Sequence, residues 1–284
     1  MDFKLSLSVP LFGVLFGLSD IAKPDISASE GFTVISYNIG NVAEEIPEAA
    51  EVWHTVYRYR PDILLLQEAA TFERTAEIAA YMEQEYGGHT AYEFTRDIGN
   101  GVAVISRFPI NGITVIPGSG VYGGAVVTAD IGGRKVLLAS IHLPYIPKER
   151  DDSGNVNLGF CSTVKTVGTE FLFDTPRSSL IKTLRERICE MEWDAVIAGG
   201  DFNTVPFSRV QTVMQNGFSD SLYLKKDYLS SSYRKIGIPV GARSDFIFSS
   251  PGLFAAESSV IRNSSGDHYP VFARFKWVET KTDE

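Results

Sequence analysis

The chain has 284 residues, of which 44% are hydrophobic and 21% charged, and its formal net charge is −9. This composition is that of an ordinary soluble globular protein. The acidic charge argues against a protein that holds nucleic acid through a broad basic surface, because neutralising phosphates needs clustered Lys and Arg. A nuclease that touches few phosphates and brings a cation stays open. The two cysteines, Cys161 and Cys189, leave the redox compartment open.

Residues 1–30 form an N-terminal segment with an apolar run from Leu5 to Leu18. The run is too short for a comfortable membrane span, but it fits a secretory signal with a weak basic start. The alternative is an extra strand or helix packed on the domain, because KLSLSV alternates with the period of a strand. Localisation is therefore unassigned, with a small preference for secretion or membrane association.

The first half of the main domain begins with a strand at 32–39, a helix at 47–60, a strand at 62–68 and a helix at 71–86. The run at 62–68 is almost continuously apolar, as expected of a strand buried on both faces. Five closely spaced strands follow, and their spacing predicts an antiparallel meander. They lie at 90–94, 101–106, 112–117, 123–131 and 135–143.

The second half opens with a polar stretch at 144–175, which is long for a connection and is our candidate for substrate contact. A helix at 176–193, a strand at 194–200 and a helix from Pro206 to Gly217 follow. The last strands lie at 243–250, 254–262 and 269–278. This order predicts an α/β (α+β) fold in which two mixed β-sheets pack face to face with helices outside.

No linker divides the chain between residues 31 and 279, so we expect one catalytic domain there, followed by a polar tail at 280–284. Polar side chains stand at the strand edges of this domain or on the turns beside them. If the strands lie side by side, these side chains converge on one rim, where ligands of α/β folds tend to bind. They are Asn38, Glu68, His142, Asp201, Asn203, Asp245, Asp267 and His268.

Each of these motifs alone has a common structural explanation. Glu68 occupies a position typical of a helix start, and the Gly-Asp-Phe-Asn sequence that ends at Asn203 is typical of a turn. The presence of five strand-edge motifs in one chain favours a functional site over these explanations.

The residue types suit metal-assisted chemistry. Glu68 and Asp267 are hard oxygen donors that fit Mg²⁺ or Mn²⁺, and Asn38 adds a neutral oxygen. Asp201 can hold or deprotonate a water molecule, which Asn203 can orient. A metal ion and a positioned water are two of the three elements that phosphoester hydrolysis needs.

The third element is a set of imidazole donors. His142 and His268 can donate to phosphate oxygens or move protons near neutral pH. Asp245 could lock His268 in one tautomer, as the orienting carboxylate of a catalytic triad does.

Seven motifs, taken in order, resemble the endonuclease/exonuclease/phosphatase superfamily over about residues 32–277. They are SYNIGN, LLLQEA, GVAVISRFPI, SIHLP, GGDFNTVP, RSDFIF and GDHYPVFA. The resemblance implies a four-layer α/β sandwich and Mg²⁺-dependent phosphoester cleavage. It also implies that Glu68 binds the metal with help from Asn38 and Asp267.

The same resemblance implies the remaining roles. Asp201 and Asn203 would handle the attacking water and the phosphate, and His142 would contact the phosphate. The pair of His268 and Asp245 would complete the site. Two glycines depart from the superfamily pattern: Gly40 stands where nuclease branches often carry an acid or Arg, and Gly266 stands where Ser is common. These two differences affect which substrate we expect, but they remove none of the residues to which the resemblance assigns the hydrolysis.

We therefore expect a Mg²⁺-dependent phosphodiesterase that acts on a lipid head-group or another small phosphoester. The acidic charge, the missing basic groove and the apolar N-terminus favour this substrate class. A secreted or surface endonuclease is the close alternative, and a non-catalytic binding module on the same fold is the alternative of another class. The sequence indicates no obligate protein partner, and we expect a monomer.

Overall fold

A computed structural model describes residues 31–40, 47–69, 71–87, 90–95, 101–118, 122–145, 168–169, 171–234, 242–262 and 266–278. The N-terminal segment at 1–30, most of the stretch at 144–175 and the tail at 280–284 lie outside the described residues. The expectations for those segments, and for Cys161, therefore stay predictions.

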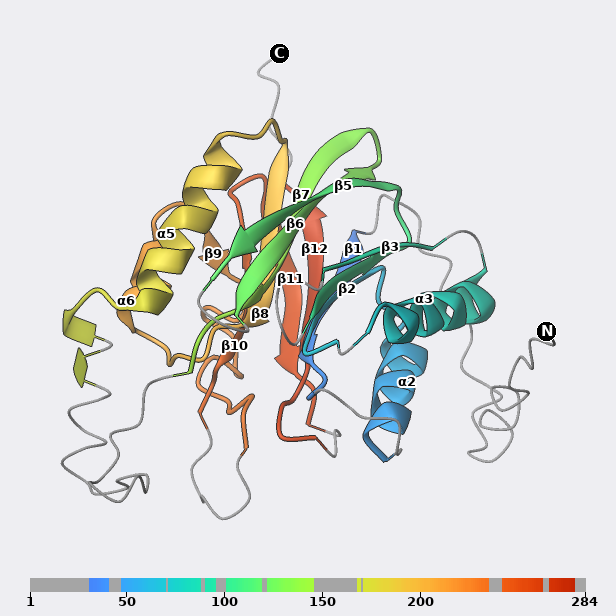
Figure 1. The fold of residues 1–284 in the computed structure, drawn as a ribbon, viewed down its shortest axis with the longest axis horizontal. Helices are drawn as coiled ribbons and strands as arrows, with labels where there is room; N and C mark the ends of the chain where they lie inside the picture. Colours follow the sequence, from blue (N-terminus) through green and yellow to red (C-terminus); the bar gives the residue numbers. More distant parts are fainter. Residues whose placement is uncertain are drawn as a thin grey trace.

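Two six-stranded mixed sheets form the centre of the molecule (Figure 1). The first sheet has the order β11-β12-β1-β2-β4-β3. Its strands are Leu253–Val260 (β11), Val271–Trp277 (β12), Phe32–Asn38 (β1), Ile63–Gln67 (β2), Val102–Ser106 (β4) and Ala91–Thr95 (β3). The second sheet has the order β5-β6-β7-β8-β10-β9. Its strands are Ile110–Pro117 (β5), Gly123–Ile131 (β6), Arg134–His142 (β7), Ala195–Asp201 (β8), Asp245–Ser249 (β10) and Ser219–Asp220 (β9).

The two sheets face each other across one apolar core, in which Val34 and Leu65 of the first sheet meet Leu138 and Ile197 of the second. Helices α2 (Pro47–Tyr59) and α3 (Phe72–Tyr86) cover the outer face of the first sheet. Helices α5 (Pro176–Cys189) and α6 (Arg209–Gln215) cover the outer face of the second. The predicted four-layer sandwich is confirmed.

Local signals explain where the helices begin. The hydroxyl of Thr71 accepts a hydrogen bond from the amide of Arg74 and so caps α3. Thr175 and Ser178 form a reciprocal capping box at the start of α5, with Pro176 in the first turn. Both helices therefore start where the sequence predicts, within one residue.

Three elements differ from the prediction. Helix α6 begins at Arg209 rather than at Pro206, because the Ser208 hydroxyl accepts from the amide of Gln211 and caps the helix there. Helix α5 ends at Cys189, four residues before the predicted end. The predicted single meander is divided: β3 and β4 pair in the first sheet, whereas β5, β6 and β7 pair in the second.

The two sheets approach closely at Gly199, just behind the end of β8. A β-carbon at Gly199 would lie 2.8 Å from Leu65 Cδ1 and 3.2 Å from Ser36 Cβ, both in the opposite sheet. We expect Gly199→Ala to lower the free energy of unfolding by about 1–3 kcal/mol, because extra volume in a packed core forces side chains out of their rotamers. Urea titration would measure this loss.

The matched control is Gly168→Ala, because a β-carbon at Gly168 would meet no atom within 4 Å. We expect that variant to stay within about 0.5 kcal/mol of the parent. Equal stability of the two variants would show that the sheets do not meet at Gly199.

Candidate active site

The ends of six strands place the predicted polar residues on one rim. Strands β1 and β2 are parallel, and so are β7 and β8, so Asn38 and His142 stand at the carboxyl ends of their strands. In the second sheet His142 is in register with Asp201, and the antiparallel β10 brings Asp245 into register with Asp201 as well. Across the two sheets, Asn38 and Asp201, which are 163 positions apart in the chain, form a hydrogen bond.

Asp201 lies at the centre of this rim and is fully buried. Its Oδ1 accepts a hydrogen bond from the amide of Asn203 at 2.9 Å. Its Oδ2 accepts from Asn38 Nδ2 at 3.1 Å and from Asn203 Nδ2 at 3.2 Å. Burial raises the pKa of Asp201, which makes its carboxylate a better proton acceptor. The bond from Asn38 joins the two sheets at the site.

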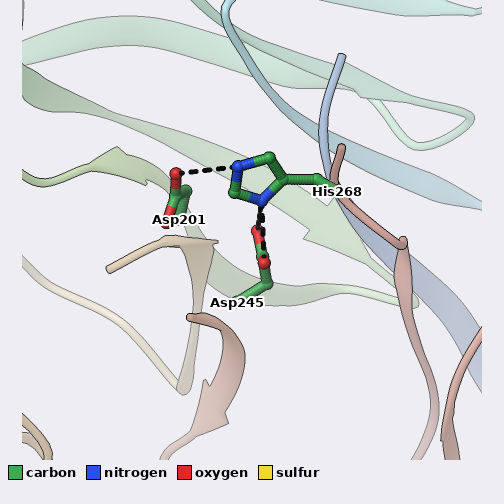
Figure 2. Close-up of side chains that lie close together, drawn as sticks. All are labelled: Asp201, Asp245 and His268. Atoms are coloured by element: carbon green, nitrogen blue, oxygen red, sulfur yellow. Dashed lines mark hydrogen bonds and ion pairs between the residues drawn. The ribbon is translucent and has the colours of Figure 1, made fainter. Parts of the chain in front are cut away.

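His268 lies between two carboxylates (Figure 2). Its Nδ1 is 3.0 Å from Asp245 Oδ2, and its Nε2 is 3.6 Å from Asp201 Oδ2. Burial disfavours charge on the imidazole, but the carboxylates of Asp245 and Asp201 outweigh burial and raise the pKa of His268 to about 10. His268 is therefore a cation at neutral pH, with Asp245 fixing the orientation of its ring.

Asp245 is itself held from the other side by hydroxyl groups. Its Oδ2 accepts from Ser232 Oγ at 2.7 Å and from Ser244 Oγ at 2.9 Å. The Ser232 hydroxyl in turn accepts from the amides of Ser244 and Asp245. Sequence reasoning missed both serines; only Ser244, next to Asp245 in the chain, offered a local signal.

His142 is fully buried, and neither of its ring nitrogens has a hydrogen-bond partner among the described residues. Its Nε2 lies 3.7 Å from Glu68 Oε1 and 3.8 Å from Asp201 Oδ2. Burial lowers the pKa of His142, so this imidazole is neutral. A buried polar group without a partner is costly, and the open nitrogen directed at the site is where a ligand atom can bind.

Glu68 follows β2 directly and adopts a left-handed backbone conformation with φ 51°. Few non-glycine residues adopt this conformation, and it recurs at functional sites. The carboxylate is partly buried, and Oε1 accepts from Asn38 Nδ2 at 3.2 Å. Burial raises the pKa of Glu68 above its ordinary value, although the hydrogen bond from Asn38 and the nearby His268 act against this rise, and Asp267 adds a smaller upward effect. A desolvated carboxylate beside a second acid is stabilised by a bound cation.

The donor set therefore fits a hard divalent cation at Glu68, Asn38 and Asp267. Asp267 is exposed, and its Oδ1 lies 3.9 Å from the position of a β-carbon on Gly40, two residues after Asn38. Two carboxylates and an amide oxygen are hard oxygen donors of the kind that Mg²⁺ or Mn²⁺ prefers.

A second group of side chains also carries atoms that could bind a metal ion, and these atoms lie close together. Atoms of Asp201, Asp245 and His268 lie within 4.8 Å of one another. Asp245 Oδ2, however, already accepts from two hydroxyls and lies against the imidazole. We therefore interpret this group as a set of hydrogen-bonded side chains that orients His268, and not as a metal site.

A comparison with known protein families identifies the family of the chain. The profile of the Endonuclease/Exonuclease/phosphatase family matches residues 35–268, a range that begins before Asn38 and ends at His268. The chain belongs to this family. Its members are hydrolases that act on phosphoester bonds, so this chain is a hydrolase and not a non-catalytic binding module. A comparison with curated proteins gave no significant match.

Solved structures of several other proteins share the fold. The human Nocturnin catalytic domain with bound sulfate has a TM-score of 0.62 and 16% identity, covering 88% of this chain and 94% of that one. D. rerio TDP2 complexed with a single-strand DNA product has a TM-score of 0.61 and 15% identity, covering 86% and 98%. A Bacteroides thetaiotaomicron mannosyl-6-phosphatase has a TM-score of 0.58 and 16% identity, covering 87% and 100%. At these identities the likeness shows the fold alone.

Proposed function

We propose that the protein is a Mg²⁺-dependent phosphodiesterase that acts on a lipid head-group or another small phosphoester. One observation carries the chemistry: the imidazoles of His142 and His268 both direct Nε2 at Asp201 Oδ2, from 3.8 Å and 3.6 Å. A buried carboxylate between a neutral and a cationic imidazole provides a proton acceptor and two phosphate contacts in one place.

Glu68, Asn38 and Asp267 would hold the cation, with Mn²⁺ as a substitute for Mg²⁺. The bound cation supplies electrostatic stabilisation of the charge that develops on the phosphoryl oxygens. Asn38 donates one amide proton to each of two carboxylates, so it fixes the spacing between Glu68 and Asp201.

The other residues accept the proton of the attacking water and bind the phosphate. Asp201 accepts the proton of the attacking water, and Asn203 holds Asp201 in place through its backbone and side-chain amides. The cationic His268 donates to a phosphoryl oxygen, and the open nitrogen of His142 binds the phosphate. A positioned water and pre-oriented donors lower the barrier without reorganising during the reaction.

Apolar side chains near the rim support a lipid substrate. Leu172 is 75% exposed and Phe173 62% exposed, and they lie a few residues before the start of helix α5. Arg177 of α5 donates to the carbonyl of Pro144, two residues after His142, so the first turn of α5 contacts the segment that follows His142. Neighbouring exposed apolar side chains mark a surface suited to an apolar partner. Among the described residues no helix is long and apolar enough to cross a membrane. Secretion or membrane association is part of this proposal.

A substrate screen tests the proposal. We expect the purified protein with Mg²⁺ to release water-soluble phosphate compounds from phospholipid vesicles and to leave supercoiled plasmid intact at the same enzyme concentration. An EDTA-treated sample is the blank. Plasmid nicking without release from vesicles would replace the lipid proposal with the endonuclease alternative.

A further inference from the structure

Three tyrosines surround the rim and have no part in the chemistry described above. Tyr122 precedes β6, Tyr145 follows β7, and Tyr233 lies between β9 and β10. We refer to Tyr122, Tyr145 and Tyr233 as the tyrosine rim. Sequence reasoning missed all three, because tyrosine is as common in cores as in sites.

The ring contacts place the tyrosine rim on two sides of the catalytic residues. The Tyr122 ring lies 4.9 Å from the His142 ring in an edge-on arrangement. The Tyr233 ring lies 4.9 Å from the His268 ring, and the two residues also form a β-bridge. Since both imidazoles direct Nε2 at Asp201, the two tyrosines flank the point where the phosphate would bind.

Tyr145 extends this arrangement toward solvent. Its ring lies 5.7 Å from the Tyr122 ring, and the residue is 53% exposed. Burial, followed by the carboxylates of Glu68 and Asp201, raises the pKa of Tyr145. The phenol therefore stays protonated, and the ring keeps its neutral, electron-rich face beside two acids.

We propose that the tyrosine rim binds the cationic alkylammonium group of a choline-type phosphoester, with Tyr145 as the outermost and most accessible ring. Several aromatic rings beside carboxylates attract a quaternary ammonium ion through the ring quadrupoles and the negative field. A quaternary ammonium ion has no N–H group and needs no hydrogen-bond acceptor. Aromatic rings can therefore contact it over a large area. The inference rests on the proposed function, because it names the head-group that the same site selects.

The arginine that follows Tyr233 in the chain is engaged by other groups. Arg234 follows Tyr233 in the chain, but its Nε donates to the carbonyl of Gly266 and its guanidinium lies over the ring of Tyr269, 4.9 Å from the centroid. Arg234 is thus engaged on Tyr269.

Two chromogenic substrates of equal shape test the inference. One is p-nitrophenyl phosphocholine, and the other is p-nitrophenyl 3,3-dimethylbutyl phosphate, in which carbon replaces the charged nitrogen. We expect a kcat/KM about tenfold higher for the choline ester, the size of a partly desolvated cation–π contact. Most of the difference should lie in KM.

Matched variants then assign the preference to the ring. We expect Tyr145→Leu to lower kcat/KM for the choline ester about fivefold and to leave kcat/KM for the 3,3-dimethylbutyl ester within about twofold of the parent value. Tyr145→Phe should retain the preference, because it keeps the ring and removes only the hydroxyl. Since Tyr145 is exposed, both variants should fold, which circular dichroism checks.

The outcomes separate this inference from the proposed function. Equal kcat/KM for the two esters in the parent enzyme, with hydrolysis that EDTA abolishes, would overturn the head-group inference and keep the phosphodiesterase. A loss of preference in Tyr145→Phe would assign the effect to the hydroxyl and overturn the role of the ring. A lower KM for the p-nitrophenyl ester of thymidine 5′-phosphate, raised in Tyr145→Leu, would show that the rim stacks on a base. If EDTA left hydrolysis unchanged, the proposed function itself would fail.

Discussion

Glu68→Gln is expected to lower kcat/KM for bis-p-nitrophenyl phosphate about 10³-fold at saturating Mg²⁺. Glu68 is the partly buried carboxylate that the proposal assigns to the cation, and its Oε1 also accepts from Asn38. The neutral amide keeps the size of the side chain but removes its charge. The loss corresponds to about 4 kcal/mol of transition-state stabilisation, the order that a metal ion contributes in hydrolysis. Initial rates measured across a Mg²⁺ titration would show both the lower rate and a weaker apparent affinity for the metal.

Glu77→Gln is the matched control, because Glu77 is an exposed acid on helix α3 that pairs only with Arg74 among the contacts described. Its rates should stay within about twofold of the parent, as expected for a change on the surface. Calorimetry with Mg²⁺ alone adds a readout that does not depend on turnover. Parent-like binding of Mg²⁺ to Glu68→Gln would refute the assignment of this carboxylate to the metal.

Local sequence patterns predicted the rim well, because each strand end has its own signal. An apolar run followed by a polar residue marks the ends of β1, β2, β7 and β8, and these patterns named Asn38, Glu68, His142 and Asp201. Residues at the ends of neighbouring parallel strands must lie together once the strands pair. The convergence of these residues was therefore predictable without any contact information.

Other features depend on contacts between distant segments and left no local pattern. The chain passes from one sheet to the other between β4 and β5, and nothing in residues 107–109 distinguishes this passage from a hairpin turn. Ser232 holds Asp245 from 13 positions away. The left-handed conformations of Glu68 and Asn203 are likewise a product of the assembled rim, since neither residue type requires positive φ.

The structure also changes how Asn203 is understood. The sequence suggests a residue that orients water or substrate, whereas its side-chain amide donates to the carbonyl of Leu143 and to Asp201. Asn203 therefore ties the end of β7 to the turn after β8 and keeps Asp201 directed at the two imidazoles. Its role in binding substrate stays a prediction.

Asp245→Asn is expected to lower kcat about 10²–10³-fold without unfolding the protein. The amide retains the shape of the carboxylate and can still accept from Ser232 and Ser244. The substitution removes the negative charge that keeps His268 cationic. The new amide can also direct an N–H at His268 Nδ1, where the Nδ1 proton requires an acceptor. Loss of an orienting carboxylate typically costs this much or more, because the imidazole is then in the wrong tautomer or charge state. Single-turnover rates on p-nitrophenyl phosphocholine would isolate the chemical step.

A double-mutant cycle distinguishes an effect through His268 from a general loss of structure. If Asp245 acts through the imidazole, Asp245→Asn combined with His268→Ala should be no slower than His268→Ala alone, because residues that act as a unit are not additive. Ser244→Ala is the control, since it removes one hydroxyl bond to Asp245 and leaves the imidazole contact; its rate should fall less than about tenfold. Additive losses in the cycle would mean that Asp245 supports the site by some route other than His268.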